Sequence, residues 1–424
     1  MASSSSSSLH VLFFSYLFIN FSYVSNAALI FPIMKDNGTN QYVTHIHQGS
    51  TPSVLPIDLV VDLGGSLLWI DCESAGHVFL SYRPARCNSI QCSTANANKC
   101  NKFCTTCGLV AKNTITGMIM NGEVGEDIIT VQSITTATVD RYLLSCAPSM
   151  LLQGLAKGAK GMVGLGKSRI SLPSQLAGVF GSNRKFSICL PSSTSPNGVM
   201  FFDTSPLIRT FPNTLAAEVS KSMVYTPLIT KAMNKGAISD EYYIGVKSIR
   251  INGRELSINK SLLSINEDGI GGTKLSTTVP YTTLETSVYD TVTKAFTQVA
   301  TSILFNMTRV AAIAPFEFCF GSENIAKTEF GSVVVPVIDL VLQSNMVKWR
   351  IYGTNSMVQV NDKVMCLGFL DGGFDVRRDS IVLGGYQLEN KLLEFDLASS
   401  RMGFTSLLKR GIECSNFNLL GDSF

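Results

Sequence analysis

The chain has 424 residues, of which 45% are hydrophobic and 15% charged, with a formal net charge of +3 at pH 7. This length is enough for two packed domains, and the composition excludes a largely disordered chain. So small a net charge predicts no stripe for binding polyanions, and we do not expect nucleic acid as a partner.

The first 27 residues have the pattern of a secretory signal peptide. A serine run precedes an apolar segment over 9–24, and small residues ending at Ala27 suit cleavage after it. A membrane anchor is the alternative, but Ser15 and Asn20 interrupt the apolar segment and basic flanking residues are missing. We therefore expect a secreted, extracellular protein without membrane association.

Residues 28–70 alternate apolar and polar side chains between short turns, as all-β proteins do. Within them, 59–61 predict a buried strand, and Gly64-Gly65 predict a tight turn after it. Asp62 would then end a rigid strand, which is a suitable place for a catalytic acid. A structural Asp that caps its own turn is the alternative.

Eleven cysteines in an exported chain predict a disulfide framework. Five of them, between 87 and 107, crowd an insertion over 72–107 whose order must come from cross-links. A zinc knot is the alternative, but no histidine lies among these five. His45 and His47 could chelate a metal, yet they have no third ligand nearby. We expect no metal and no cofactor, and the odd count leaves one thiol over.

Further elements follow along the chain. Residues 121–131 read as a hairpin, and 170–176 as the start of a short helix with proline in its first turn. A segment rich in Pro, Ser and Thr over 204–225 marks a domain boundary. Asn252-Gly253 predicts a tight hairpin turn, and 285–305 has helical spacing.

Modification sites can also be assigned from short patterns. Sequons at Asn37, Asn259 and Asn306 predict surface glycans in a secreted protein. Disulfide connectivity does not follow from sequence, so pairings remain open. The candidate pairs are Cys319 with Cys366 and Cys189 with Cys414, and further disulfide cysteines are Cys72 and Cys146.

Four separated motifs resemble those of pepsin-like aspartic proteases. They are the active-site loop at 60–70, the glycine-rich strand at 161–166, the second loop at 274–281 and the strand at 380–385. The resemblance implies an all-β, bilobal fold of two β-barrel-like domains with few short helices. It implies an N-terminal lobe over 28–222, which holds the Cys-rich insertion, and a C-terminal lobe over 223–424. The 121–131 hairpin would be the flap over the cleft.

The protease mechanism needs two carboxylates that share one proton. By the resemblance Asp62 is the first, but Ser276 occupies the place of the second. A hydroxyl cannot supply the missing charge or exchange that proton. Thr278 replaces a glycine of the second loop, Leu63 replaces a bracing threonine, and residues 83–141 contain no flap tyrosine. Asp62 and Ser276 are therefore expected to be vestigial, without peptidase activity.

More narrowly, the chain resembles the plant extracellular dermal glycoprotein family, through residues 60–65, 83–87, 355–358 and 386–390 and the Ser276 loop. That family includes xyloglucan-specific endoglucanase inhibitors, with cereal xylanase inhibitors and basic 7S globulins as relatives. The resemblance implies a monomeric, inert protein of the plant cell wall that plugs the cleft of microbial endoglucanases in defence.

Arginine suits such plugging, because its planar fork binds carboxylates and a glycosidase presents two of them. Arg377 and Arg378 lie in a loop over 371–379, and Arg378 resembles the arginine that family inhibitors insert. Two solvated loop charges are the alternative. At the other inhibitory loop the family arginine is replaced by Glu329, which would repel the enzyme's carboxylates.

Three explanations of Glu329 stay open: a different target, substitution by Lys327, or lost inhibition. A binding or storage protein without inhibitory action is the second functional reading. An active aspartic endopeptidase is the third, and Ser276 disfavours it.

Overall fold

The computed structural model describes residues 29–50, 54–72, 81–97, 105–131, 137–195, 197–202, 219–233, 237–329, 331–374, 379–407 and 412–417. The expected signal peptide, most of the predicted boundary over 204–225, and both loop arginines, Arg377 and Arg378, lie outside these ranges. The boundaries of the two lobes at 28–222 and 223–424 therefore stay predictions.

Strands dominate both halves of the chain. The first half contains β1 (Leu29–Lys35), β2 (Tyr42–Gln48), β3 (Leu55–Asp62), β4 (Trp69–Asp71), β5 (Arg83–Pro84), β6 (Gly108–Lys112), β7 (Ile119–Val131), β8 (Ala137–Ala147), β9 (Gly161–Gly164), β10 (Lys185–Cys189) and β11 (Gly198–Phe202). The second half contains β12 (Val224–Ile229), β13 (Tyr243–Ile244), β14 (Ser248–Ile251), β15 (Arg254–Glu255), β16 (Thr273–Leu275), β17 (Thr282–Leu284), β18 (Arg309–Val310), β19 (Cys319–Gly321), β20 (Ile338–Val341), β21 (Lys348–Ile351), β22 (Met357–Asn361), β23 (Val364–Leu367), β24 (Phe369–Asp371), β25 (Ile381–Leu383), β26 (Lys391–Asp396) and β27 (Arg401–Ser406).

Helices are short. They are α2 (Ile90–Thr94), α3 (Leu172–Phe180), α6 (Lys260–Leu263), α7 (Thr286–Ala300), α8 (Gly353–Ser356) and α9 (Gly385–Leu388), with single 3-10 turns η1 (Ser149–Leu152) and η4 (Cys414–Phe417). None of the helices in the described ranges is long and apolar enough to cross a membrane.

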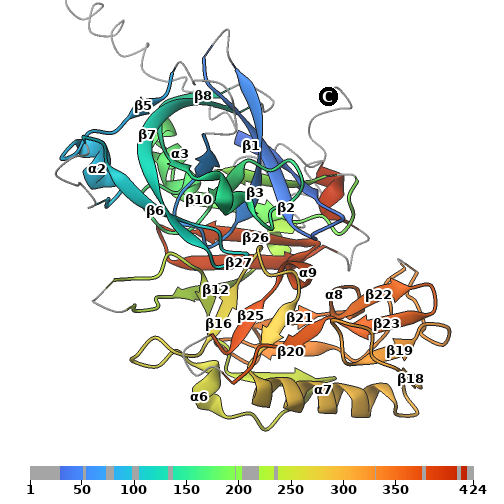
Figure 1. The fold of residues 1–424 in the computed structure, drawn as a ribbon. Coiled ribbons are helices and arrows are strands. Elements are labelled where there is room, and N and C mark those ends of the chain that lie inside the picture. The colour runs from blue at the N-terminus through green and yellow to red at the C-terminus, as the bar shows by residue number, and fades with distance from the viewer. Residues whose placement is uncertain are drawn as a thin grey trace, which may run out of the picture.

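The strands form two lobes, which Figure 1 shows one above the other with β26 and β27 between them. An antiparallel sheet in the order β1, β11, β10, β26, β27, β12 joins the lobes, because β10 of the first half pairs with β26 of the second. Phe186, Tyr242 and Phe395 pack against this junction, with ring centroids of the last two 4.5 Å apart. The bilobal, all-β expectation is confirmed.

Both halves repeat one local topology. In the first lobe β9 runs parallel to β3 and antiparallel to β4, and β4 runs parallel to β8. In the second lobe β25 runs parallel to β16 and antiparallel to β17, and β17 runs parallel to β24. The two motifs that resemble protease active-site loops therefore follow equivalent strands, β3 and β16.

The hairpin predicted at 121–131 is wrong. These residues belong to the single long strand β7, and the hairpin turn lies earlier, at 113–118, between β6 and β7. Gly122 lies inside this strand and lets strands approach, since a Cβ there would lie 2.4 Å from Ser145 Oγ. By contrast, Asn252 and Gly253 do form the β14–β15 turn, with φ of 47° and 86°.

The helix predicted over 285–305 is shorter, ending at Ala300. Glu285 caps its start by accepting the N–H of Ser287 at 3.0 Å. Just beyond this end Ile303 and Leu304 are exposed, so these two apolar residues do not extend the buried face of the helix. The helix predicted from 170–176 is present as α3, with proline in its first turn.

Disulfides tie both lobes. Among the described cysteines they join Cys72 to Cys146, Cys92 to Cys107, Cys189 to Cys414 and Cys319 to Cys366. Both candidate pairs are therefore present, and Cys87 is also disulfide-bonded. The described ranges contain no group of three or more His, Cys, Asp or Glu side chains that could hold a metal ion.

Candidate functional site

Asp62 ends β3 inside the first lobe, where β2 and β9 flank the strand. Its Oδ1 accepts the N–H of Gly64 at 3.0 Å, and its Oδ2 accepts the Thr114 hydroxyl at 2.8 Å. Burial raises the pKa of the Asp62 carboxyl, while these two hydrogen bonds oppose the rise. Both carboxylate oxygens thus have partners within the chain.

Ser276 stands in the second lobe where Asp62 stands in the first. The β3–β9 ladder sets Asp62 opposite Gly164. The β16–β25 ladder sets Leu275 opposite Leu383, and Ser276 is the next residue, donating its N–H to the Leu383 carbonyl at 2.9 Å. The strand register therefore supports the sequence alignment of the two loops.

The Ser276 hydroxyl is buried in its own turn. It accepts the N–H groups of Thr278 at 3.2 Å and Val279 at 3.3 Å, and it lies 3.1 Å from the Thr278 hydroxyl. Thr278, which occupies the glycine position of the protease loop, is itself buried. At this point of the repeat the second lobe carries a neutral hydroxyl that caps its own turn.

The two loops contact each other through one threonine. Thr277 donates its hydroxyl to the Val61 carbonyl at 2.6 Å and accepts the Leu63 N–H at 3.0 Å. Leu63 occupies the equivalent position of the first loop, and it has no hydroxyl that could make the matching hydrogen bonds to the backbone of the second loop. The brace between the lobes is therefore one-sided, as the replacement by leucine predicts.

The turn at 113–118 covers Asp62 and is held down at several points. Asn113 is fully buried; its Nδ2 donates to the carbonyls of Leu151 and Gln153, and its Oδ1 accepts N–H groups of the turn. Trp69 Nε1 donates to the Lys112 carbonyl at 3.1 Å just before the turn. The flap hairpin, which we define as β6, 113–118 and β7, is thus pinned with Thr114 on Asp62.

Sequence reasoning missed Asn113 and Thr114. The signal was present, because Asn113 and Gly117 are typical turn residues between two apolar runs. The hairpin was instead predicted over 121–131, C-terminal to this turn.

Charged side chains lie beside the two loops. Lys274 Nζ lies 3.0 Å from Glu241 Oε1 and 3.2 Å from Asp379 Oδ2. Lys231 also pairs with Asp379, and Tyr243 donates its hydroxyl to Glu241 at 2.7 Å. Burial alone would lower the pKa of Lys274, but the carboxylates of Glu241 and Asp379 raise it by more, so the pKa of Lys274 is raised overall. This network fixes Asp379 at the end of the loop over 371–379.

The other end of that loop is also fixed. Gly372 donates its N–H to the Leu284 carbonyl at 2.7 Å, and Gly373 donates to Asp371 Oδ1 at 2.9 Å. Arg377 and Arg378 lie outside the described residues, so the structure does not test their predicted role.

Lys327 and Glu329 lie on a small exposed hairpin. Lys327 forms an isolated antiparallel β-bridge with Val333, and Thr328 donates its N–H to the Ser332 carbonyl at 2.8 Å. Glu329 therefore lies at the tip of the hairpin. Both Lys327 and Glu329 are exposed. The predicted glycan acceptors Asn37, Asn259 and Asn306 are exposed as well.

Comparisons with known proteins cover both lobes. The family described as "Xylanase inhibitor N-terminal" matches residues 42–203, and "Xylanase inhibitor C-terminal" matches residues 241–406. "Probable aspartic proteinase GIP2" of Nicotiana benthamiana is 49% identical, over 92% of this chain and 91% of that protein. "Gamma conglutin 1" of Prunus dulcis is 39% identical, over 92% of this chain and 89% of that protein.

Solved structures agree. "Crystal structure of edgp" has a TM-score of 0.84 and 45% identity, covering 92% of this chain and 98% of that chain. The basic 7S globulin from soybean has a TM-score of 0.78 and 33% identity, covering 93% and 99%. The chain therefore belongs to the xylanase-inhibitor family of pepsin-like plant proteins, together with the extracellular dermal glycoprotein and the basic 7S globulins.

Proposed function

We propose that this protein is a secreted, catalytically inactive aspartic-protease homologue that inhibits microbial glycoside hydrolases, with a xyloglucan-specific endo-β-glucanase as the target. The observation that carries the proposal is that, of two equivalent loops in a fold matched by xylanase-inhibitor families, one carries Asp62 and the other a turn-capping Ser276 hydroxyl. Without a second carboxylate beside Asp62, the two loops have no pair of acids that could share a proton. The function is then expected to lie on the surface of the protein.

Further support comes from the closed flap hairpin. Thr114 occupies an oxygen of Asp62 that a protease would need for its catalytic water. Because Asn113 holds the turn from both sides, opening this contact would break several hydrogen bonds at once. This arrangement favours a scaffold role over peptide hydrolysis.

The proposed inhibitory group is Arg378, with Arg377 beside it. A guanidinium that enters a cleft between two carboxylates forms parallel charge-assisted hydrogen bonds and loses little freedom in doing so. The anchored Gly372 and Asp379 at the two ends of its loop would limit the entropy lost on binding.

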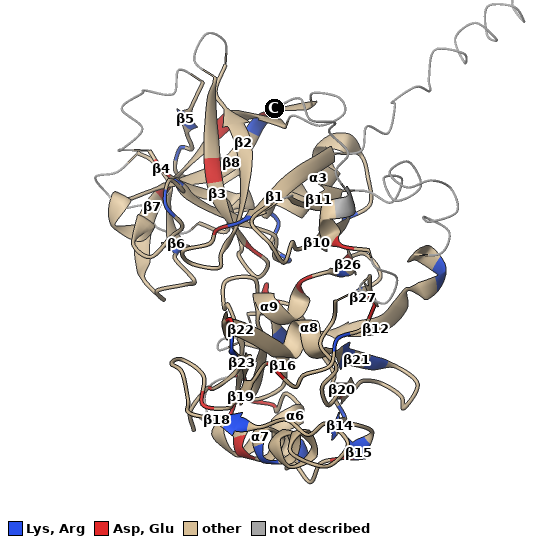
Figure 2. Cartoon of the chain, turned by 90° about the vertical axis from the view of Figure 1, so that its right-hand side faces the viewer, with Lys and Arg blue, Asp and Glu red and all other residues tan. Residues whose placement is uncertain are grey.

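Secretion and glycosylation are part of the proposal. Disulfides of this number are typical of proteins that mature in an oxidising compartment, which supports export to the cell wall. Figure 2 shows Lys and Arg interspersed with Asp and Glu on both lobes, which is consistent with a protein partner rather than a polyanion. We propose that the inhibitor acts as a monomer.

The test is a titration of a xyloglucan-specific endoglucanase with the purified protein. We expect xyloglucan hydrolysis to fall to a small residue near one equivalent, and Arg378→Ala to weaken inhibition by about tenfold or more. Arg254→Ala, which removes an exposed arginine of β15, is the matched control and should inhibit like the unchanged protein. Full hydrolysis at equimolar protein would remove the inhibitor proposal.

A binding or storage protein is the second candidate. Several relatives are named globulins or conglutins, including "Basic 7S globulin" of Glycine max at 36% identity. Glu329 at the exposed hairpin tip also favours this reading, because it would repel a glycosidase's carboxylates. Absence of inhibition together with tight binding to a peptide from the same tissue would support it.

A further inference from the structure

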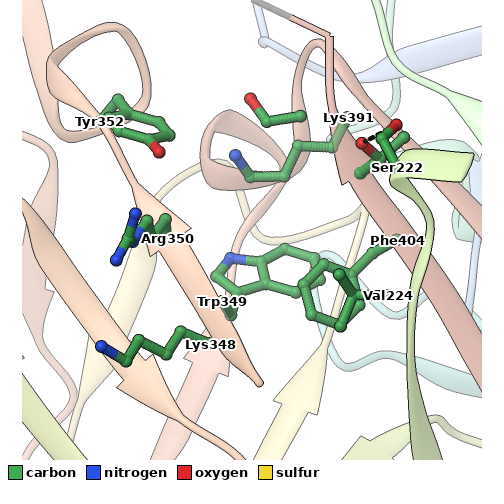
Figure 3. A pocket seen from close by; sticks show the side chains of 10 residues that line it. Ser222, Val224, Lys348, Trp349, Arg350, Tyr352, Lys391 and Phe404 are labelled. Carbon is green, nitrogen blue, oxygen red and sulfur yellow. Dashed lines mark hydrogen bonds between the residues drawn. The ribbon is translucent and has the colours of Figure 1, made fainter. Parts of the chain in front are cut away.

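A pocket lies outside the site described above, between β21 and the strands β12, β26 and β27. Its volume is about 330 Å³, within the range of small-molecule sites. Val224, Trp349 and Phe404 form an apolar side, with the Trp349 and Phe404 ring centroids 5.0 Å apart. In Figure 3 the Lys391 amine projects over this side, away from the β26 ribbon.

Lys391 is only 2% exposed. Its Nζ lies 3.2 Å from Asn355 Oδ1 and 5.9 Å from the Trp349 ring centroid. No carboxylate pairs with it among the described residues. A buried ammonium without a counter-ion is costly, so an anion from outside would be stabilised there.

Two further polar atoms in the pocket lack partners. Trp349 Nε1 and Ser406 Oγ are buried, and neither has a hydrogen-bond partner among the described residues. Trp349 Nε1 is a donor only, and Ser406 lies opposite Lys391 in the β26–β27 ladder. Buried donors that the protein leaves unpaired are usually satisfied by water or a ligand.

We propose that this pocket binds a small organic carboxylate, with its anionic group on Lys391, Trp349 Nε1 and Ser406 and its apolar part on Val224, Phe404 and the Trp349 ring. The occupant can be a free acid or the C-terminal carboxylate of a peptide, since both present the same group. Neither reading depends on inhibition of a glycosidase.

Protonation supports the assignment. Burial lowers the pKa of Lys391 to about 7. The other titratable groups that line the pocket are Lys348 and Arg350 of β21, and Tyr352; Arg350 is paired with Asp339 at 3.0 Å. A bound carboxylate would raise the pKa of Lys391 again, so binding near neutral pH takes up a proton.

The probes are phenylacetate and its neutral isostere phenylacetamide, titrated into the full secreted chain by calorimetry in two buffers of different ionisation enthalpy. We expect phenylacetate to bind at least about tenfold more tightly, with proton uptake and a change in Trp349 fluorescence. Lys391→Met should abolish the preference, whereas Lys363→Met, at an exposed lysine of the same lobe outside the pocket, should keep it. Equal binding of the two probes, or no binding at millimolar concentration, would overturn the proposal.

Additional titrations distinguish a free organic acid from the C-terminal carboxylate of a peptide as the ligand. N-acetyl-Gly-Phe with a free C-terminal carboxylate, compared with its C-terminal amide, tests whether the pocket binds the end of a peptide. If the free peptide binds more tightly than phenylacetate, the pocket is assigned to peptide C-termini. Inorganic phosphate that binds as tightly as phenylacetate would contradict the role of the apolar side. Because the two probes are compared on the unchanged protein, the test does not depend on the folding of Lys391→Met.

Discussion

At the scale of single residues, Asp62 is held as a structural acceptor. Its two oxygens take the Gly64 N–H and the Thr114 hydroxyl, and its counterpart in the repeat caps another turn. Asp62→Asn keeps an oxygen for Gly64 and removes a buried charge, so we expect a change in unfolding free energy below about 1 kcal/mol. Asp62→Ala leaves both donors unpaired and should cost about 1–3 kcal/mol. Denaturant unfolding of the two variants measures the difference; equal losses would contradict this role.

Lys391 predicts a pH dependence of stability. The folded pKa of about 7 lies below the ordinary lysine value near 10.4. Between these values the unfolded chain binds more protons than the folded chain, so the free energy of unfolding rises with pH. Lys391→Met removes this term, and its stability relative to the unchanged protein should therefore fall by about 3 kcal/mol from pH 6 to pH 9. Thermal or urea unfolding at the two pH values checks this, with Lys348→Met as control. A difference that does not vary with pH would refute it.

Glu329 tests the inhibitory surface. If the exposed hairpin tip faces the carboxylates of an endoglucanase, Glu329→Arg replaces repulsion by attraction. We expect the inhibition constant to improve by about tenfold or more, with the larger effect at low salt. Glu267→Arg, an exposed charge change elsewhere in the same lobe, should leave it unchanged. Weaker inhibition by Glu329→Arg would mean that the tip faces a basic surface.

At the scale of elements, the flap hairpin depends on Asn113. Asn113→Ala would leave the carbonyls of Leu151 and Gln153 and two turn N–H groups without these partners. We expect a loss of about 2–4 kcal/mol and faster amide exchange over 113–118. Asn183→Ala, at an exposed asparagine, is the control. Unchanged exchange over 113–118 would show that the turn is held by other contacts.

Sequence patterns predicted elements unevenly. Strand β3 and the Asn252-Gly253 turn followed directly from apolar runs and turn chemistry. The hairpin predicted over 121–131 failed, since Gly122 there is required by the close approach of Ser145 and Cys146, which lie far along the chain. The end of α7 failed for a related reason: apolar Ile303 and Leu304 prolong the helical pattern, but the fold gives them nothing to pack against.

The candidate site was predicted only in part. Asp62 stands out because it ends an apolar strand, and Ser276 because it has the equivalent place in the repeated motif. Thr114 and Lys391 do not, since their roles depend on contacts to Asp62 and Asn355 that only the folded chain brings together. Local sequence carries no information on such tertiary partners.

At the scale of the whole molecule, two similar halves meet at a shared sheet, and their equivalent loops carry Asp62 in the first half and Ser276 in the second. Tyr42 and Lys35 of the first lobe contact Glu389 of the second, both at 2.7 Å, so the lobes are also fixed away from this point. The pepsin-like fold is therefore fixed around the two loops, and we propose that recognition of a partner depends on the surface loops.

The most direct measurement of this claim is cleavage of a denatured protein substrate at acid pH, with and without pepstatin. We predict no pepstatin-sensitive cleavage above the level of Asp62→Asn, because in our proposal Ser276 takes the place of the second carboxylate. Pepstatin-sensitive cleavage that Asp62→Asn abolishes would contradict the account and assign the protein to the active aspartic endopeptidases.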